Sequence, residues 1–384
     1  MGRSRPHRRR NAGKSAARES KPSQLGGLVQ LAQIPDHIIC SNIIPRLPGK
    51  SLIRFKCVSK LWNSTILDLN STSFGNIRGP KTASMSFEYT KRSINLCFHM
   101  MDTKGSTEKF SLEKPITEYY HRDGHIAGSC NGLLLIIFDA SFFLWNPCTA
   151  YFSCVLESDK MKPPYFVTNS GICYDSSTDD YKVVIGLQNS SIRAREFSRG
   201  PVLVAGLRNK GWKKLNFPYR CHQGTSGVSF NGFLHWRANT NKGYCTNPAP
   251  NKIIVFDRET DQVRELPMLQ DRSRHILGLG VLDDCFCMSC WDINQVEVIA
   301  IKEYGNEESW TPLFEISILK FYSISYGTKL TPLMLMENGE VMMLRDDETI
   351  FSYNPQTMEY NYEYPKVLGR CPHIFIESLN NPHA

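Results

Sequence analysis

Short turns of the type Asn-Gly and Asp-Asp return about every fifty residues along most of this chain. Their second residues are 48, 52, 52 and 55 residues apart. The five turns are Asn131-Gly132, Asp179-Asp180, Asn231-Gly232, Asp283-Asp284 and Asn338-Gly339. Such dipeptides favour tight hairpins, and three of them lead directly into an apolar or aromatic run typical of a strand. A period of about fifty residues built from short strands is the length of one four-stranded propeller blade.

A second element supports the same period. An aromatic residue precedes Asn-Pro or Asp-Arg, and a Thr follows, in FLWNPCTA (143–150), IVFDRETD (254–261) and FSYNPQTM (351–358). We interpret each as a strand that ends in a tight turn. A large β-sandwich would also give short strands, but it would not require the same cues in every repeat. We therefore expect an all-β domain that is a β-propeller of about six blades, with Trp145, Trp236, Trp291 and Trp310 packed between blades.

The segment before this domain has a different pattern. Residues 31–66 read LAQIPDHIICSNIIPRLPGKSLIRFKCVSKLWNSTI, which predicts short helices interrupted at Pro45 and Pro48. Ser51 and Ser59 are expected to cap the second and third helices. About forty residues form a marginal core, so we expect this module to share its apolar surface with something else.

These two parts resemble a known combination. The stretch RLPGKSLIRFKCVSKLWNSTI is similar to the plant form of the F-box, and GICYDSSTDDYKVV (171–184), with NGLLLI and WNP before it, resembles the F-box-associated domain of plant F-box proteins. The chain is then expected to comprise a basic tail (1–28), a small all-α F-box module (29–69), a linker (70–83) and a kelch-like β-propeller (84–384).

The resemblance implies a role in ubiquitination. The F-box would dock on a Skp-family adaptor and through it on a cullin and a RING protein, while the propeller would bind a protein target. By motif position, the residues that contribute to the module or to its adaptor face are Ile34, Pro35, Ile38, Leu47, Pro48, Leu52, Phe55, Val58 and Trp62. A purely internal helical packing unit and a helix-turn-helix DNA reader are the alternatives for this module.

The charge of the chain is concentrated in the tail. The formal net charge is +8, but residues 1–22 hold eight Lys and Arg side chains and one Glu, which leaves the rest at +1. The tail lacks the apolar residues that folding requires, so we expect it to be disordered and to serve, at most, as an import signal or a non-specific phosphate contact. We expect a protein of the nucleus or the cytoplasm with no membrane partner, because no signal peptide or membrane-spanning run occurs. A nucleic-acid partner is not expected, because +1 outside the tail gives little charge for binding phosphates.

No catalytic or cofactor motif is complete. Cys285, Cys287 and Cys290, with His275 nearby, lack the second half of a zinc site, and alternation along a buried strand explains the first two. Asp179-Asp180 is interpreted as a hairpin between Tyr174 and Tyr181. We expect no enzyme, metal or cofactor, and keep two alternatives: an interaction or glycan-binding propeller that works without a ligase, and a propeller enzyme. The target is unknown, although 188–200 and 239–251 are long enough to be binding loops.

Overall fold

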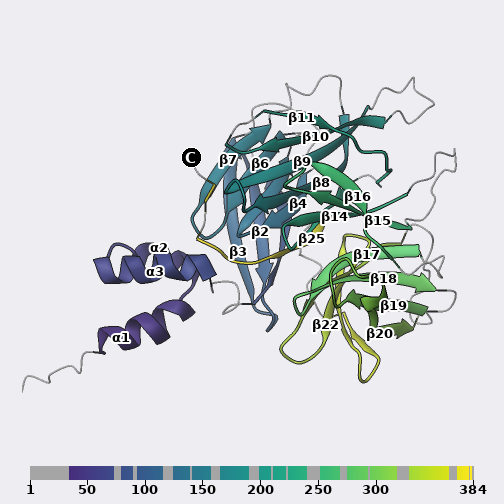
Figure 1. Ribbon diagram of the computed structural model, residues 1–384. Coiled ribbons are helices and arrows are strands. Elements are labelled where there is room, and N and C mark those ends of the chain that lie inside the picture. Colours follow the sequence, from purple (N-terminus) through teal and green to yellow (C-terminus); the bar gives the residue numbers. More distant parts are fainter. Residues whose placement is uncertain are drawn as a thin grey trace, which may run out of the picture.

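The computed structural model shows a helical part followed by a ring of β-sheets (Figure 1). It describes residues 34–72, 79–89, 93–115, 124–138, 141–156, 165–189, 199–208, 211–221, 224–239, 251–268, 275–292, 295–317, 328–362, 370–379 and 381–382. The predicted basic tail, 1–28, lies outside the described residues.

The helical part consists of three consecutive segments. The first combines α1 (Asp36–Ile38), a π-helical stretch η1 (Ile39–Ile43) and a 3-10 turn η2 (Ile44–Arg46), and it is followed by α2 (Gly49–Phe55) and α3 (Lys60–Thr72). Ser59 caps α3 as expected, since its Oγ accepts a hydrogen bond from Trp62 N at 3.1 Å. The expectation for Ser51 was wrong, because α2 begins at Gly49 and Ser51 lies inside it. None of the described helices combines the length and apolar character needed to cross a membrane.

Apart from a short 3-10 helix, η4 (Glu307–Ser309), the remaining elements form six sheets, which we number as blades. Blade 1 contains β25 (Arg370–Phe375), β1 (Lys81–Tyr89), β2 (Ser93–Met101) and β3 (Thr107–Pro115). Blade 2 contains β4 (Gly124–Cys130), β5 (Leu133–Phe138), β6 (Ser141–Asn146) and β7 (Tyr151–Leu156). Blade 3 contains β8 (Tyr165–Asp175), β9 (Asp180–Asn189), β10 (Arg199–Gly206) and β11 (Lys213–Leu215), with β12 (Thr225–Ser226) parallel to β8.

The other three blades have the same order of strands. Blade 4 contains β13 (Val228–Phe230), β14 (Phe233–Ala238), β15 (Lys252–Asp257) and β16 (Gln262–Glu265). Blade 5 contains β17 (His275–Leu282), β18 (Cys285–Asp292), β19 (Gln295–Ile301) and β20 (Trp310–Ser317). Blade 6 contains β21 (Leu330–Leu335), β22 (Val341–Arg345), β23 (Thr349–Asn354) and β24 (Glu359–Asn361). Both α3 and β1 extend into the segment 70–83 that the sequence assigned to a linker.

Each of the five recurring turns joins the first and second strands of one blade. Asn131 and Gly132 have φ values of 47° and 80°, and Asp283 and Asp284 have 48° and 55°. A two-residue hairpin with positive φ at both positions matches the twist of its strands, and Asn, Asp and Gly tolerate that conformation best. Tyr174 and Tyr181 are in register across the hairpin that contains Asp179, as predicted, and this longer turn has a positive φ at Asp179 only.

The Asn-Pro and Asp-Arg elements form the turn between the third and fourth strands. The side-chain Oδ1 atoms of Asn146, Asp257 and Asn354 each accept a hydrogen bond from the backbone N–H two residues later at 2.9 Å. This local bond closes the turn without any contribution from another blade.

The ring is closed by strands from the two ends of the domain. β25 pairs antiparallel with β1, with Lys81 opposite Phe375 and Thr82 opposite Ile374. Because these two strands are not consecutive in the sequence, no tight turn connects them. Six blades therefore leave only five recurring turns in the sequence.

The core of the propeller consists of the contacts between neighbouring blades. Six buried clusters each combine residues of two adjacent blades, including the pair formed by blades 6 and 1. Trp145 belongs to the cluster between blades 1 and 2, Trp236 to that between blades 3 and 4, Trp310 to that between blades 4 and 5, and Trp291 packs against that between blades 5 and 6. Both faces of each blade are buried, which excludes the sandwich and confirms the six-bladed propeller.

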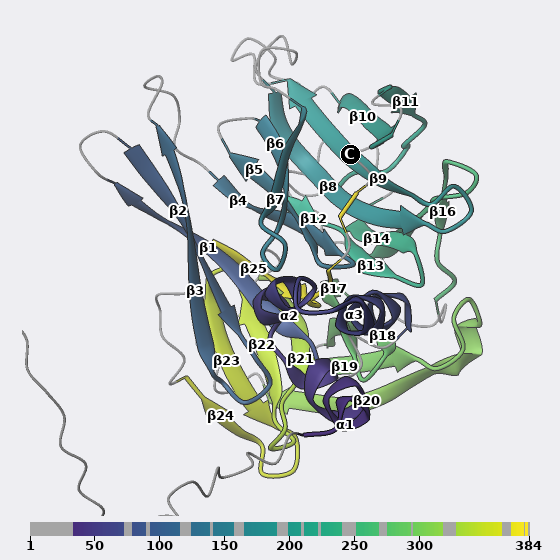
Figure 2. The same ribbon diagram turned by 90° about the vertical axis from the view of Figure 1, so that its left-hand side faces the viewer.

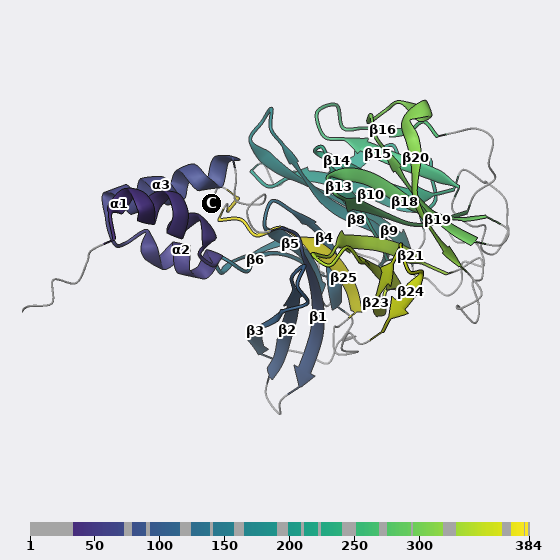
Figure 3. The same ribbon diagram turned by 90° about the horizontal axis from the view of Figure 1, so that it is seen from below.

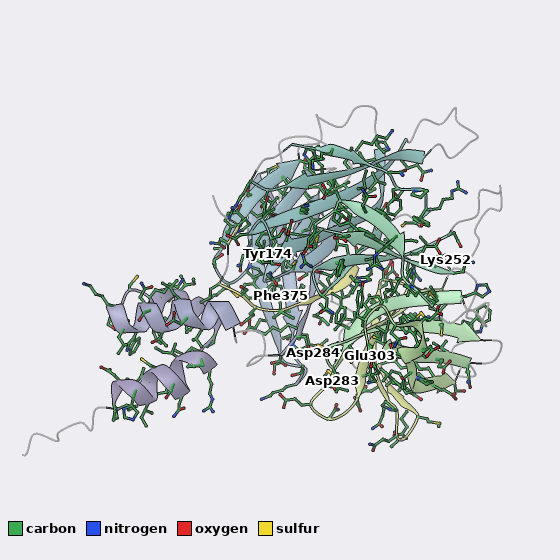
Figure 4. All side chains as sticks on the ribbon, viewed as in Figure 1. Tyr174, Lys252, Asp283, Asp284, Glu303 and Phe375 are labelled. Carbon is green, nitrogen blue, oxygen red and sulfur yellow. The ribbon has the colours of Figure 1, made fainter. Side chains whose placement is uncertain are left out.

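The two faces of the propeller differ in their connections. Strands one and two, and strands three and four, are joined at one face, which we call the short-turn face; the other connections leave from the opposite face, the loop face. The helices lie on the short-turn face, with the blades arranged around them (Figure 2). Figure 4 likewise places Asp283 and Asp284 toward the helices, and Lys252, at the start of β15, on the far side.

Acidification is expected to weaken the fold through His235, which lies in β14 with none of its surface exposed. Its Nδ1 donates to Val228 O, so Nε2 of the neutral ring accepts from the Tyr304 hydroxyl. Burial lowers the pKa of His235 from 6.5 to about 4. The unfolded chain binds the proton first, so the stability contributed by the neutral ring is complete above pH ~6.5 and is lost as the pH falls toward 4.

The measurement is the free energy of unfolding in urea at a series of pH values. Between pH ~6.5 and ~4.5 we expect His235→Gln, which is neutral throughout, to lose about 2 to 3 kcal/mol less stability than the wild-type chain. Equal losses in both proteins would contradict a neutral, buried His235.

Candidate functional site

The helical module has a small core of its own. Ile44, Leu52 and Ile66 are fully buried, and seven further apolar residues are packed around them. Phe55 and Trp62 meet edge to face with their ring centroids 5.4 Å apart. In α3 the inward residues Trp62, Ile66 and Leu69 follow the spacing i, i+4, i+7 of a helix with one buried face.

The same module exposes an unusual amount of apolar surface. Ten large hydrophobic residues are exposed in the described part of the chain, and half of them lie in this module, either in its helices or next to them. They are Ile34 (54%), Ile38 (37%), Val58 (58%), Leu61 (50%) and Leu67 (49%). Isolated apolar residues are normal on protein surfaces, but such a density on so small a module is typical of a surface that another protein covers.

The structure separates the nine residues predicted from the sequence into three groups. Leu52 is buried, and Leu47, Phe55 and Trp62 are half-buried in the module core. The five exposed residues are Ile34, Pro35, Ile38, Pro48 and Val58. The predicted set does not include the exposed residues Leu61 and Leu67. Both fall outside the buried i, i+4, i+7 stripe of α3, so that spacing could have identified them as exposed.

The module is fastened to the short-turn face of the propeller (Figure 3). Cys148, in the turn after β6, and Leu379, which follows β25, complete the module core. A Cβ atom on Gly49 would lie 2.8 Å from Cys148 Sγ, so α2 begins in close contact with blade 2. Lys50 Nζ lies 3.8 Å from the centroid of the Phe110 ring in blade 1. Part of the shared apolar surface that the sequence predicted is therefore the propeller itself.

The segment after β25 connects blade 1, blade 2 and the helical module. Asn146 Nδ2 donates to Ser378 O at 3.1 Å, and Thr149 Oγ1 donates to Asn381 Oδ1 at 2.5 Å. Lys81 Nζ forms an ion pair with Glu377 Oε1 at 2.9 Å. The strand that closes the ring thus continues into a segment that contacts blades 1 and 2 and the module core.

Gly49→Val is expected to separate the module from the propeller. The new side chain would overlap Cys148, which is only 8% exposed, and relief of that overlap requires α2 to move away. Cys148 should then react faster with iodoacetamide, measured by mass spectrometry of its peptide. Ser64→Val, at an exposed position of α3, is the matched control and should leave Cys148 protected. Unchanged protection in Gly49→Val would contradict the contact.

The centre of the propeller contains a cavity of about 970 Å³. Its lining includes Cys130 of β4, Val228 of β13, Leu279 of β17, Leu333 of β21 and His373 of β25, so the inner strands of most blades contribute. This volume lies at the upper end of the range found for ligand sites. The cavity therefore follows the channel along the propeller axis.

Two ends of this channel are lined by charged residues. At the short-turn face are Arg258, Asp283 and Asp284, where Arg258 Nη1 donates to Asn231 O at 2.8 Å. Toward the loop face are three more, namely Arg237, Lys329 and Asp347. The structure thus places cationic and anionic side chains in a channel where the sequence offered no constellation.

The thiols do not form a chemical centre. Cys287 packs between blades 5 and 6, whereas Cys290 packs between blades 4 and 5, so the two face opposite sides of β18. Among the residues that the structure describes, no group of three or more His, Cys, Asp or Glu is placed to hold a metal ion. Burial raises the pKa of Cys130, which lines the cavity, to about 11, and a protonated thiol is a poor nucleophile.

The two loops that the sequence singled out for target binding, 188–200 and 239–251, lie mostly outside the described residues. They connect β9 to β10 and β14 to β15, and these strands end at the loop face. That face is opposite the helical module.

Both parts of the chain match family models. Residues 32–74 match the F-box domain, and residues 81–363 match the F-box associated beta propeller domain. The second match covers more than half of the chain.

Several plant proteins are similar over nearly the whole length. An F-box/kelch-repeat protein of Arabidopsis thaliana is 26% identical over 367 residues, which are 89% of this chain and 94% of that protein. The F-box protein CPR1 of the same plant is 26% identical over 346 residues, which are 83% of this chain and 81% of that protein. The order of the two parts is therefore shared with these relatives.

Proposed function

Since this chain belongs to the family of F-box proteins with an F-box associated beta propeller domain, we propose that it is the substrate-recognition subunit of a Skp-cullin-F-box ubiquitin ligase. The helical module docks on a Skp-family adaptor, and the propeller binds a protein target. The observation that carries this proposal is the cluster of exposed apolar side chains on a module that already has its own core.

The exposed members of the predicted set contact the adaptor. Ile38 and Val58 present apolar surface that costs free energy as long as water covers it, and the adaptor buries this surface. Leu52 supports the module from within, and Phe55 and Trp62 hold α2 against α3. The nine residues thus divide into contact residues and residues that shape the contact surface.

The chain makes no covalent bond itself. It holds the target near a ubiquitin-charged enzyme on the cullin and RING protein, so that the reaction proceeds at a high effective concentration. The contacts of Gly49, Cys148 and Leu379 favour this role, because a module fixed to the propeller fixes the direction in which a bound target faces. The protein works in the nucleus, the cytoplasm or both.

Reconstitution tests the proposal. The chain is co-expressed with a plant Skp-family adaptor, and the complex is isolated by size-exclusion chromatography. We expect a one-to-one complex that recruits the cullin and the RING protein. The assembled complex should support ubiquitin transfer. A chain that folds but elutes apart from the adaptor at micromolar concentrations would refute the ligase role.

A further inference from the structure

The buried cation Arg237 in the channel has no ion-pair partner in the part of the chain that the structure describes. Arg237, near the end of β14, is 9% exposed and lines the central cavity. Its Nη1 donates to the backbone carbonyl oxygens of Ile276 and Leu277 in blade 5. No carboxylate of the described residues lies within ion-pair distance of Arg237. Burial lowers its pKa to about 10, so the guanidinium remains charged at neutral pH.

Lys182 shows how another partly buried cation of the propeller is compensated. Lys182, between blades 3 and 4, lies 2.8 Å from Asp261 Oδ1 and 3.5 Å from Asp175 Oδ2. A buried charge without a partner is costly, and proteins avoid it unless another group provides compensation. Two carbonyl dipoles on one nitrogen leave most of the donor capacity of a guanidinium unused.

The neighbouring charges leave a net positive site. Lys329, just before β21, forms an ion pair with Asp347, in the turn after β22. Asp347 is also the carboxylate whose charge favours the protonated forms of both Arg237 and His373, which belong to blades 4 and 1. Burial lowers the pKa of His373 to about 4, so the ring is neutral at pH 7. Arg237 of blade 4 and Lys329 of blade 6 thus lie near one carboxylate, Asp347, which among the described residues pairs with Lys329 alone, and the three charges sum to +1.

The site has room for a ligand. The cavity of about 970 Å³ continues past Arg237 between apolar residues of blades 5, 6 and 1, such as Leu279, Leu344 and Ile374. A guanidinium fork matches a carboxylate through two parallel hydrogen bonds. One negative charge balances the site, whereas a dianionic phosphate would exceed its charge.

We propose that Arg237, Lys329 and Asp347 bind the carboxylate of an acidic target segment that enters the channel. This inference rests on the proposed function, and it names the chemistry of the target: an Asp or Glu side chain next to apolar residues. Arg237 makes the direct contact, Lys329 adds positive charge, and Asp347 holds Lys329 in place.

Selection from a phage-displayed library of random dodecapeptides tests the proposal on the full chain bound to its adaptor. Recovered peptides should be enriched in Asp or Glu, and Arg237→Met should weaken their binding by about thirtyfold or more. Replacing the acid of one peptide by its amide should cost a similar factor in the wild-type protein and nothing further in Arg237→Met. Arg258→Met, at the other end of the same cavity, is the matched control and should bind the peptides normally.

The thermal unfolding transition of each variant shows whether its propeller is folded, and adaptor binding by each variant separates this test from that of the ligase role. Recovery of no peptides, recovery without acidic enrichment, or equal losses in Arg237→Met and Arg258→Met would overturn the proposal. Tighter binding of a phosphoserine peptide than of its glutamate counterpart would overturn the assignment of a carboxylate.

Discussion

The double substitution Ile38→Asp and Val58→Asp is expected to abolish binding of the Skp-family adaptor. Each change places a carboxylate in a surface that the adaptor must desolvate, and an unpaired charge in an interface costs several kcal/mol. We expect affinity to fall at least a hundredfold, measured by isothermal titration calorimetry with the purified adaptor. Since Ile38 and Val58 are 37% and 58% exposed, the free energy of unfolding should change by less than about 1 kcal/mol.

The propeller offers a control that matches this exposure closely. Leu313 is 38% exposed and Met358 is 62% exposed, and both lie outside the helical module. Leu313→Asp with Met358→Asp adds the same two charges to the same chain and should leave adaptor binding unchanged. If both double variants bind alike, the adaptor does not use the exposed residues of α1 and the α2–α3 connection. Leu52→Asp is unsuitable for this purpose, because Leu52 is fully buried and its replacement disrupts the module itself.

Gly278→Ala is expected to cause a large loss of stability in the propeller. Gly278 lies in β17, and a Cβ atom there would lie 2.2 Å from Leu330 O and 2.6 Å from Thr331 Cα of β21. These neighbours are backbone atoms of the inner strand of blade 6, so they cannot rotate away as a side chain can. Relief requires blades 5 and 6 to separate, which should cost about 4 kcal/mol or more. The melting temperature should fall by about 10 °C or more.

Gly171→Ala, in the inner strand β8, serves as the comparison. The Cβ atom would meet Leu234 Cδ2 at 3.0 Å, which is the far end of a flexible side chain. We expect a loss of no more than about 1 kcal/mol, measured by the same thermal and urea unfolding experiments. Equal melting temperatures for Gly278→Ala and the wild-type chain would contradict the close approach of β17 to β21.

Much of the propeller could be predicted because its repeating elements are local. The turn at Asn131-Gly132 needs only its own positive φ angles, and the turn after β6 needs only the bond from Asn146 to Cys148 N. Such short-range signals are written into the sequence wherever they occur, so their spacing indicated blades of about fifty residues. Blade 1 left no recurring turn, because its first two strands, β25 and β1, come from opposite ends of the domain.

The helical module could be predicted less completely. The motif identified its residues, but the same apolar character fits a core position such as Leu52 and an exposed position such as Val58. The contact with Cys148 and Leu379 decides which side of each helix is covered, and these residues are far away in the sequence. The start of α2 also differs from the expected one at Ser51. Pro48 has an extended backbone and is the N-cap residue, so the helix already begins at Gly49.

By itself, the sequence determined the combination of a helical F-box module with a repetitive β-domain, the repeat length and the turns that punctuate it. The tertiary structure alone decided which apolar residues of the module remain exposed, how the module is fastened to the short-turn face, and that Arg237 lies in the channel with no carboxylate partner among the described residues. The physical reason is the range of the interactions. A hairpin turn is fixed by φ angles and bonds among neighbouring residues, whereas burial and charge balance depend on blades that meet only after the ring has closed.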